Sequence, residues 1–245
     1  MRVRAALFEA PGVPLVVREI DLEGPGPGDA LVRIDAVGIC GSDLHVVKGE
    51  WVRPRPMVLD MHRDVVADDG ASKDSGAPEH AAKQNVVENI KTLLAAARKS
   101  GTQVIHIHHR KGKGARAHGN MSRMFRGLRD GEGFDAGTRG MEVMPGLETQ
   151  SGDIAIEKER ASAFAGTELD VVLRAMAIDT LILTGAWTNF SVESTARYAT
   201  DIGYRVIVAS DGTSSIGDEW HDAAIGYALT WLCEIAPSAE IAAKL

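Results

Sequence analysis

Ser191 lies in the segment of this sequence whose residues are best suited to chemistry. Residues 184–195, TGAWTNFSVEST, follow an apolar run from Thr180 to Leu183 and open a helical pattern. This order predicts a tight strand-to-helix turn, where backbone N–H groups and the positive end of the helix converge. Such a turn can hold a nucleophile and the oxyanion formed by its attack. A serine there can also serve as a helix N-cap.

The turn resembles the nucleophile turn of the isochorismatase-like cysteine hydrolases, and the resemblance covers roughly residues 57 to 245. In that family a cysteine occupies the position of Ser191. The resemblance implies that Ala186, Trp187 and Thr188 shape the turn, that backbone N–H groups near Trp187 and Ser191 form an oxyanion hole, and that the Ala186–Trp187 peptide is cis.

Two further motifs of the same family occur in the family's order. Residues 58–64, VLDMHRD, are similar to a hydrophobic-Asp-Met-x-x-Asp pattern, in which Asp60 ends the first core strand. Residues 156–164, IEKERASAF, are similar to the segment in which a lysine, here Lys158, leaves the third strand. The resemblance implies that Asp60 is the general base, that Lys158 is its cationic partner, and that Ser191 stands in the nucleophile's place.

The three residue types suit acyl transfer. A carboxylate beside an ammonium can take the nucleophile's proton and return it to a leaving amine, while the ammonium stabilises the anion. A thiol with a pKa of about 8.5 ionises readily, whereas an alcohol is a much weaker acid, so attack by Ser191 would depend more on Asp60. Taken singly, Asp60 could instead cap a strand end and Lys158 could be a surface residue.

Three interpretations of Ser191 stay open. It is an engineered replacement of cysteine made to trap a substrate complex, a natural serine variant, or a residue at a site that needs no covalent nucleophile. True isochorismatases resemble this fold, lack the cysteine, and cleave a vinyl ether by protonation from the aspartate. Because Asn189 and residues 192–195 resemble the amide-hydrolysing branch, we favour a hydrolase of small amides; ether hydrolysis and a catalytically silent binding or assembly protein are the alternatives.

The candidate substrate-binding residues come from these motifs and from two further segments. They are His109, Asp64, Phe164, Asn189 and Arg123. Trp187 is expected to form a wall of the same pocket. The substrate is expected to be a small amide, and amides that bear a carboxylate belong to the expected class.

The segment 105–109, IHIHH, invites a metal interpretation, because alternate strand positions place His106 and His108 on one face. Nicotinamidases of the same superfamily carry a metal near this strand end through an Asp-x-His pattern, but the aspartate is missing here. We therefore expect no metal and no cofactor. His109 then lines the pocket, and the other two are core histidines.

The segment from Arg110 to Arg129 is basic in a chain that is acidic overall. It contains no acidic residue and seven basic ones: Arg110, Lys111, Lys113, Arg116, Arg123, Arg126 and Arg129. Such a segment is commonly a solvated loop. It could also cap the strand ends and attract a carboxylate-bearing substrate.

Composition sets the broad class of the protein. The chain has 245 residues, 44% hydrophobic and 25% charged, with a net charge of -7. This suits one sizeable core, or one core plus a small appendage, and argues against a general nucleic-acid binder. We expect no membrane span, no secretory leader, and a cytoplasmic homo-oligomer, a dimer or tetramer. Cys40 and Cys233 suggest no disulfide framework.

Strand and helix patterns alternate after residue 57. Apolar runs predict buried parallel strands, and helical spacing from Val86 to Ala97, with Gly101 as a stop, predicts a helix. The strands are expected at 103–108, 153–157, 180–183 and 204–209. The pattern predicts an α/β domain over residues 57–245 with a doubly wound, mostly parallel sheet and its site at the carboxyl ends of the strands.

Residues 1–56 form a separate β-rich appendage in this interpretation, with short strands at 3–8, 15–20 and 30–37. The segment 38–45, GICGSDLH, resembles the amino terminus of zinc-dependent medium-chain alcohol dehydrogenases, in which Cys40 would bind zinc and Ser42 and His45 would relay a proton. The continuation Gly-His-Glu of that family is absent, and no dinucleotide-binding turn follows. Because two ligands rarely hold zinc, we expect no redox chemistry and a role through contacts alone.

Overall fold

The structure is a computed structural model that describes residues 2–9, 13–28, 54–111 and 122–245. The chain divides into two units, Met1–Val52 and Arg53–Leu245. In the first, β1 (Arg2–Leu7) and β2 (Val16–Asp21) pair antiparallel, which confirms the first two predicted strands. The predicted strand at 30–37 and the segment 38–45 lie outside the described residues.

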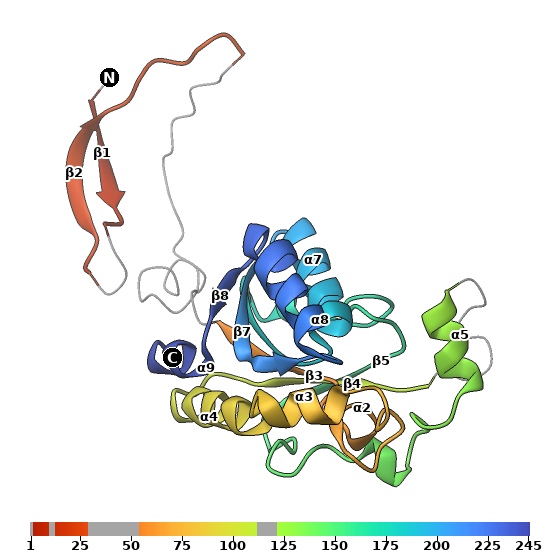
Figure 1. Cartoon of the computed structure of the whole chain (residues 1–245). Coiled ribbons are helices and arrows are strands. Elements are labelled where there is room, and N and C mark those ends of the chain that lie inside the picture. The colour runs from red at the N-terminus through yellow and green to blue at the C-terminus, as the bar shows by residue number, and fades with distance from the viewer. Residues whose placement is uncertain (1, 10–12, 29–53, 112–121) are drawn as a thin grey trace. The chain divides into compact units, whose positions relative to one another are not determined.

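The second unit is built on a six-stranded sheet in which every pairing is parallel (Figure 1). The spatial order is β5-β4-β3-β6-β7-β8. Strands β3, β4 and β5 thus follow one another toward one edge of the sheet. Strand β6 then pairs with the other side of β3, and β7 and β8 extend the sheet to the opposite edge. This confirms the doubly wound α/β fold, whose switch point lies between β3 and β6. The strands are β3 (Arg55–Leu59), β4 (Ile105–His109), β5 (Ile154–Lys158), β6 (Thr180–Ala186), β7 (Arg205–Ser214) and β8 (Glu234–Ala236).

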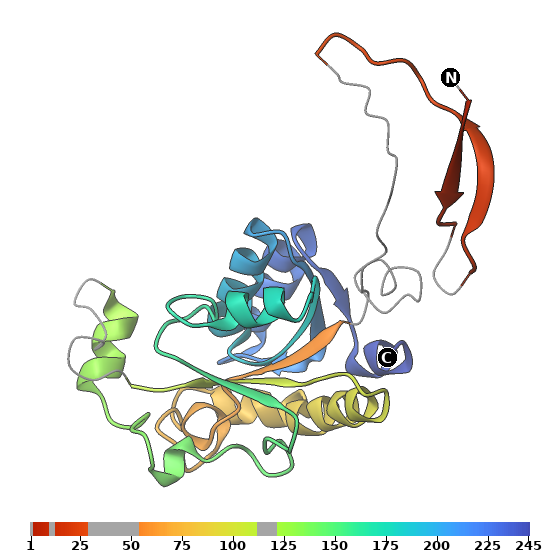
Figure 2. The same ribbon diagram turned by 180° about the vertical axis from the view of Figure 1, so that it is seen from behind.

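Helices cover both faces of this sheet (Figures 1 and 2). Because side chains alternate along a strand, Val58 packs toward the face covered by α2, α3 and α4, while Met57 and Leu59 pack toward α6 and α7. The helices on the first face are α2 (Arg63–Val66), α3 (Ala77–Lys83) and α4 (Val86–Lys99), with α9 (Ser238–Ala243) beside α4; those on the second are α6 (Leu169–Ala175) and α7 (Glu193–Asp201). The predicted helix at 86–97 is confirmed as α4, which ends just before Gly101.

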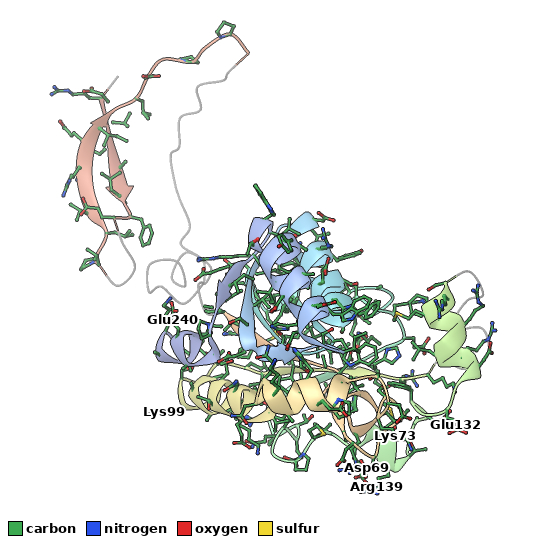
Figure 3. The ribbon with its side chains drawn as sticks, in the orientation of Figure 1. Asp69, Lys73, Lys99, Glu132, Arg139 and Glu240 are labelled. Carbon is green, nitrogen blue, oxygen red and sulfur yellow. The ribbon has the colours of Figure 1, made fainter. Side chains whose placement is uncertain are left out.

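The domain also contains shorter elements. They are α5 (Arg123–Asp130), the 3-10 helices η2 (Arg139–Met141) and η5 (Leu229–Trp231), the π-helices η3 (Thr188–Val192) and η4 (Ala224–Ala228), and α8 (Asp218–Ala223). An ion-pair cluster ties α2 to η2, since Asp69 binds Arg63 at 2.6 Å and Arg139 at 2.8 Å; Figure 3 labels Asp69 and Arg139. None of the helices formed by the described residues has the length and apolar character needed to cross a bilayer.

Candidate active site

Asp60 is the first residue after β3, at the switch point of the sheet. Its φ of 54° lies in the left-handed region, which a non-glycine residue adopts mainly where its surroundings fix it. Asp60 N donates to the carbonyl of Ile107 on β4, at 2.9 Å. This hydrogen bond fixes the backbone at Asp60 against β4.

The structure brings Asp60, Lys158 and Ser191 together. Ser191 Oγ donates to Asp60 Oδ2 at 2.7 Å, and Lys158 Nζ lies 2.7 Å from the same oxygen. Lys158 Nζ also donates to Ser191 Oγ and to the carbonyl of Ala161, each at 2.7 Å. All three side chains are buried, with exposed fractions of 5% for Asp60, 2% for Lys158 and 5% for Ser191.

Burial and charge oppose each other in this group. Burial raises the pKa of Asp60, but Lys158, His109 and the hydrogen bond from Ser191 together hold that pKa below its usual range. Burial also lowers the pKa of the Lys158 ammonium, even though Asp60 favours the charged form. The carboxylate is thus ionised and accepts from the serine hydroxyl, as a general base must.

Gly185 lets the two central strands approach closely enough for this contact. A Cβ at Gly185 would lie 2.0 Å from the carbonyl oxygen of Leu59, the residue before Asp60. The φ of Gly185, +108°, is also one that other residues rarely adopt. A side chain here would separate the end of β3 from the end of β6.

The turn that carries Ser191 begins at the Ala186–Trp187 peptide, which is cis. The carbonyl of Trp187 accepts from Phe190 N at 3.1 Å and from Val192 N at 3.2 Å, so η3 is a compact turn that leads directly into α7. Val192, not Ser191, caps α7. The Ser191 hydroxyl is directed to Asp60 instead of to the helix terminus.

A cavity of about 140 Å³ opens beside these groups. A cavity of about 150 Å³ can hold a benzene-sized ligand, so the volume suits a small substrate. Asp60, Lys158 and Ser191 lie in its lining, which is otherwise largely apolar; the remaining residues are Val65, His109, Met124, Leu128, Phe134, Arg160, Ala161, Ala186, Trp187 and Phe190. Apolar walls around a few convergent polar groups are typical of a binding site.

Comparison with known proteins agrees with this geometry. The isochorismatase domain family matches residues 57–239, about three quarters of the chain. The chain belongs to the isochorismatase family.

Individual relatives differ in how much of the chain they match. Ureidoacrylate amidohydrolase RutB of Yersinia enterocolitica is 30% identical over 76% of this chain and 90% of its own length. The uncharacterized isochorismatase family protein YwoC of Bacillus subtilis is 43% identical, over 35% of this chain and 46% of that protein. A crystal structure of a cysteine hydrolase from Pseudomonas syringae superposes with a TM-score of 0.69 at 25% identity, covering 89% of this chain and 97% of the other.

The amino-terminal segment is similar to a different family. Residues 26–67 match the alcohol dehydrogenase GroES-like domain, and the match overlaps the start of the isochorismatase domain. An alcohol dehydrogenase of Rhizobium meliloti is 42% identical over 66 residues, which are 26% of this chain and only 19% of that enzyme. The segment therefore resembles a small part of a dehydrogenase and precedes the isochorismatase-family domain.

Some of the candidate substrate-binding residues of this isochorismatase-family domain line the cavity, and others do not. His109 lines the cavity, and Trp187 forms one wall, with its indole N–H donating to the carbonyl of Val65 at 3.2 Å. Asn189 does not belong to the lining; its side-chain oxygen accepts from Ser215 Oγ at 2.5 Å. Thr188 is fully buried beneath the turn.

Three further predicted positions, like Asn189, are not part of the cavity lining. Asp64 supports a loop, because its carboxylate accepts from the backbone N–H groups of Ala71 at 3.0 Å and Phe134 at 2.7 Å. Phe164 is a core residue, stacked on Tyr198 with 5.5 Å between ring centroids. Arg123 is exposed on α5.

Other residues of the lining were not predicted. Arg160 lies two residues after Lys158, with its guanidinium carbon 5.5 Å from the centroid of the Phe125 ring. Met124 and Leu128 extend from α5 and Phe134 follows it. Met124 and Leu128 are spaced i and i+4, which places them on one helix face. This spacing is the sequence pattern from which their shared position in the lining could have been predicted.

The histidines of β4 do not converge on a metal site. Among the described residues, no three His, Cys, Asp or Glu side chains are grouped to hold a metal ion. His106 Nε2 contacts Asp153 at 3.1 Å, whereas His108 Nδ1 contacts His62 Nε2 at 3.3 Å. The two are bound to different partners.

Proposed function

We propose that this isochorismatase-family chain hydrolyses the C–N bond of a small amide, with Ser191 as nucleophile. The observation that carries the proposal is the shared oxygen: Ser191 Oγ and Lys158 Nζ both lie 2.7 Å from Asp60 Oδ2. A base, a cation and a nucleophile within hydrogen-bond distance are the parts that covalent catalysis requires. The similarity to an amidohydrolase, RutB, supports the choice of reaction.

The reaction follows from the order of the contacts. Asp60 takes the hydroxyl proton as Ser191 Oγ bonds to the substrate carbonyl carbon, and backbone N–H groups of Trp187 and Ser191 stabilise the oxyanion. Asp60 returns the proton to the departing amine as the C–N bond breaks, leaving an acyl ester on Ser191. A water molecule then attacks the ester, again with Asp60 as base, and Asp60 returns the proton to Ser191 Oγ as the acid is released. Lys158 keeps the carboxylate ionised between these steps.

The cavity supports a substrate with an apolar body and an anionic group. Val65, Trp187 and Phe190 supply apolar contacts, while Arg160 adds a cationic group beyond the Asp60–Lys158 pair. A carboxylate on the substrate would meet Arg160 as a charge-assisted partner. We propose His109 as a further contact to the substrate.

We further propose that residues 1–56 act through contacts alone and that the chain works as a cytoplasmic homo-oligomer. The extent of the dehydrogenase match supports a role through contacts, because the match ends at residue 67 and covers a small share of the dehydrogenase. A two-stranded sheet is not stable alone. It therefore needs another surface to cover it.

The test compares the native chain with Ser191→Cys and Ser191→Ala on a panel of small amides with and without a carboxylate. We expect Ser191→Cys to hydrolyse a preferred amide at least ten times faster, because a thiolate is accessible near neutral pH. Ser191→Ala should lose the reaction. Undiminished turnover by Ser191→Ala would contradict a covalent mechanism, and isochorismate cleavage by that variant would favour the ether-hydrolase alternative.

A further inference from the structure

A buried polar network behind the nucleophile turn contains two histidines that the proposed reaction does not use. Thr188 Oγ1 lies 2.9 Å from His221 Nδ1, and Ser215 N donates to His80 Nδ1 at 3.1 Å. Ser215 Oγ donates to the Asn189 side chain, and the two imidazole centroids are 5.2 Å apart. We call these five residues the histidine clamp.

The clamp joins segments that are distant in the sequence. His80 belongs to α3, His221 to α8, and Ser215 follows β7, whereas Thr188 and Asn189 are the first two residues of η3. Four of the five are buried: Thr188 and Ser215 fully, His80 to within 3% and His221 to within 5%. Buried polar groups are costly unless their hydrogen bonds are made, so the network fixes the geometry of η3.

The hydrogen bond to Ser215 determines the state of His80. A backbone N–H only donates, so His80 Nδ1 must carry a lone pair and the ring proton must be on Nε2. His80 Nε2 lies 3.4 Å from Asp218 Oδ1, and Lys83 binds the other oxygen of that carboxylate. Burial lowers the pKa of His80, although Asp218 opposes the shift. The hydrogen bond from Ser215 N requires a neutral His80 ring, and burial favours that neutral form.

His221 is positioned by two contacts. Besides the contact with Thr188, its ring lies 5.2 Å from the His80 ring, centroid to centroid, and burial together with the neighbouring His80 lowers its pKa. Asp218 and Asp222 of its own helix act in the opposite direction. Thr188 thus meets an imidazole that packs against His80.

We propose that His80 and His221 are positioning residues for the nucleophile. His221 fixes Thr188 directly, and His80 fixes Asn189 through Ser215; the nucleophile follows two positions later in the same π-helix. Displacement of a reacting atom by about 1 Å can cost about 100-fold in rate. Loosening the clamp should therefore turn the side chain at position 191 away from Asp60 and Lys158 without unfolding the domain.

The experiment measures reactivity at position 191 without any amide substrate. In the full chain carrying Ser191→Cys, iodoacetamide alkylation at position 191 is followed against pH by peptide mass spectrometry, which separates it from Cys40 and Cys233. His80→Asn keeps an acceptor near Nδ1, whereas His80→Leu removes it. We expect His80→Leu to slow alkylation at pH 7 at least fivefold and to raise its pH midpoint, because the thiolate loses Lys158. His80→Asn should stay within twofold.

A second pair of variants keeps the test decisive where His80→Leu does not fold. Ser215→Ala removes one hydroxyl of the clamp and should slow alkylation about threefold, as expected for loss of one hydrogen bond of about 0.7 kcal/mol. Ser100→Ala removes a hydroxyl bonded to Thr102 at the end of α4, away from the turn, and should change nothing. Equal rates in His80→Leu, Ser215→Ala and the parent would overturn the proposal. Because alkylation needs no amide hydrolysis, this outcome is distinct from failure of the proposed function.

Discussion

Two clusters of buried or half-buried titratable side chains in this domain differ in whether their members are charged. In the first, Asp60 and Lys158 face each other at 2.7 Å, and the pKa of Asp60 stays low despite burial. In the second, burial lowers the pKa of His62 and His106, and lowers that of His108 to about 4. Asp60 of the first cluster and His62 of the second both follow β3 within three residues, so their position in the chain does not explain the difference.

The difference comes from the partner of each group. The carboxylate of Asp60 has an ammonium beside it, which outweighs the cost of burial. The ring of His108 has mainly other imidazoles beside it, His62 through a 3.3 Å contact and His106 with 6.1 Å between ring centroids. Asp60 thus keeps its charge beside Lys158, whereas His108, beside two imidazoles, does not. The charged cluster is the one suited to proton transfer, and the neutral cluster is suited to packing.

Removing the charge of Asp60 should have the largest effect. Asp60→Asn leaves the Lys158 ammonium buried without its partner, so we expect the free energy of unfolding to fall by about 3 kcal/mol. Loss of the general base should lower kcat/KM for the preferred amide by about 1,000-fold. Urea unfolding and steady-state kinetics measure the two effects. Asp69→Asn, which breaks the more exposed ion pairs with Arg63 and Arg139, should destabilise the fold much less; an equal loss in both variants would contradict the account.

Separating the central strands should have the next largest effect. The Cβ of Gly185→Ala would lie 2.0 Å from the Leu59 carbonyl oxygen, at a φ of +108°. We expect a loss of about 2–4 kcal/mol in unfolding free energy and of most activity. Gly203→Ala is the matched control, because Gly203 has a φ of +95° but no atom within 4 Å of the added Cβ. It should cost only about 1 kcal/mol.

The neutral histidines should make the fold sensitive to acid. Because the pKa of His108 is about 4 in the folded chain and about 6.5 when unfolded, the unfolded state binds more protons between these values. Stability should therefore fall as pH drops from 6.5 toward 4, by up to about 2 kcal/mol from His108. His108→Asn should reduce this slope in urea unfolding at several pH values. An unchanged slope in the variant would exclude His108 as a source.

Removing residues 1–52 should change the chemistry least. We expect kcat for the preferred amide to stay within about twofold, while solubility or elution volume in size-exclusion chromatography changes, because a small β unit needs a second surface. Activity assays and chromatography of the two chains compare these readouts. Stoichiometric zinc at Cys40, or NAD-dependent alcohol oxidation by the full chain, would contradict a role through contacts alone.

The sequence predicted the fold and the identity of the central residues better than it predicted the pocket wall. Buried strands appear as apolar runs, and Asp60, Lys158 and Ser191 lie within local motifs at strand ends. Phe164 was misplaced because its contacts, Tyr198 and Tyr204, come from later elements. A local pattern does not reveal such long-range packing.

The histidine clamp shows the same limit. His80 and His221 are more than 100 residues apart, and each occurs in an ordinary helical segment. Only folding brings their rings within 5.2 Å of each other and behind the nucleophile turn. The charge state of a buried histidine likewise depends on which groups the fold places beside it.

The central claim, covalent attack by Ser191, is tested most directly by intact-mass spectrometry of the full chain mixed with p-nitrophenyl acetate. We expect an acetyl adduct that peptide mapping assigns to Ser191, accompanied by release of one equivalent of p-nitrophenol, with no such adduct in Ser191→Ala. Asp60→Asn should form the adduct far more slowly. Steady turnover without an adduct at position 191, or equal labelling of Ser191→Ala, would contradict the account.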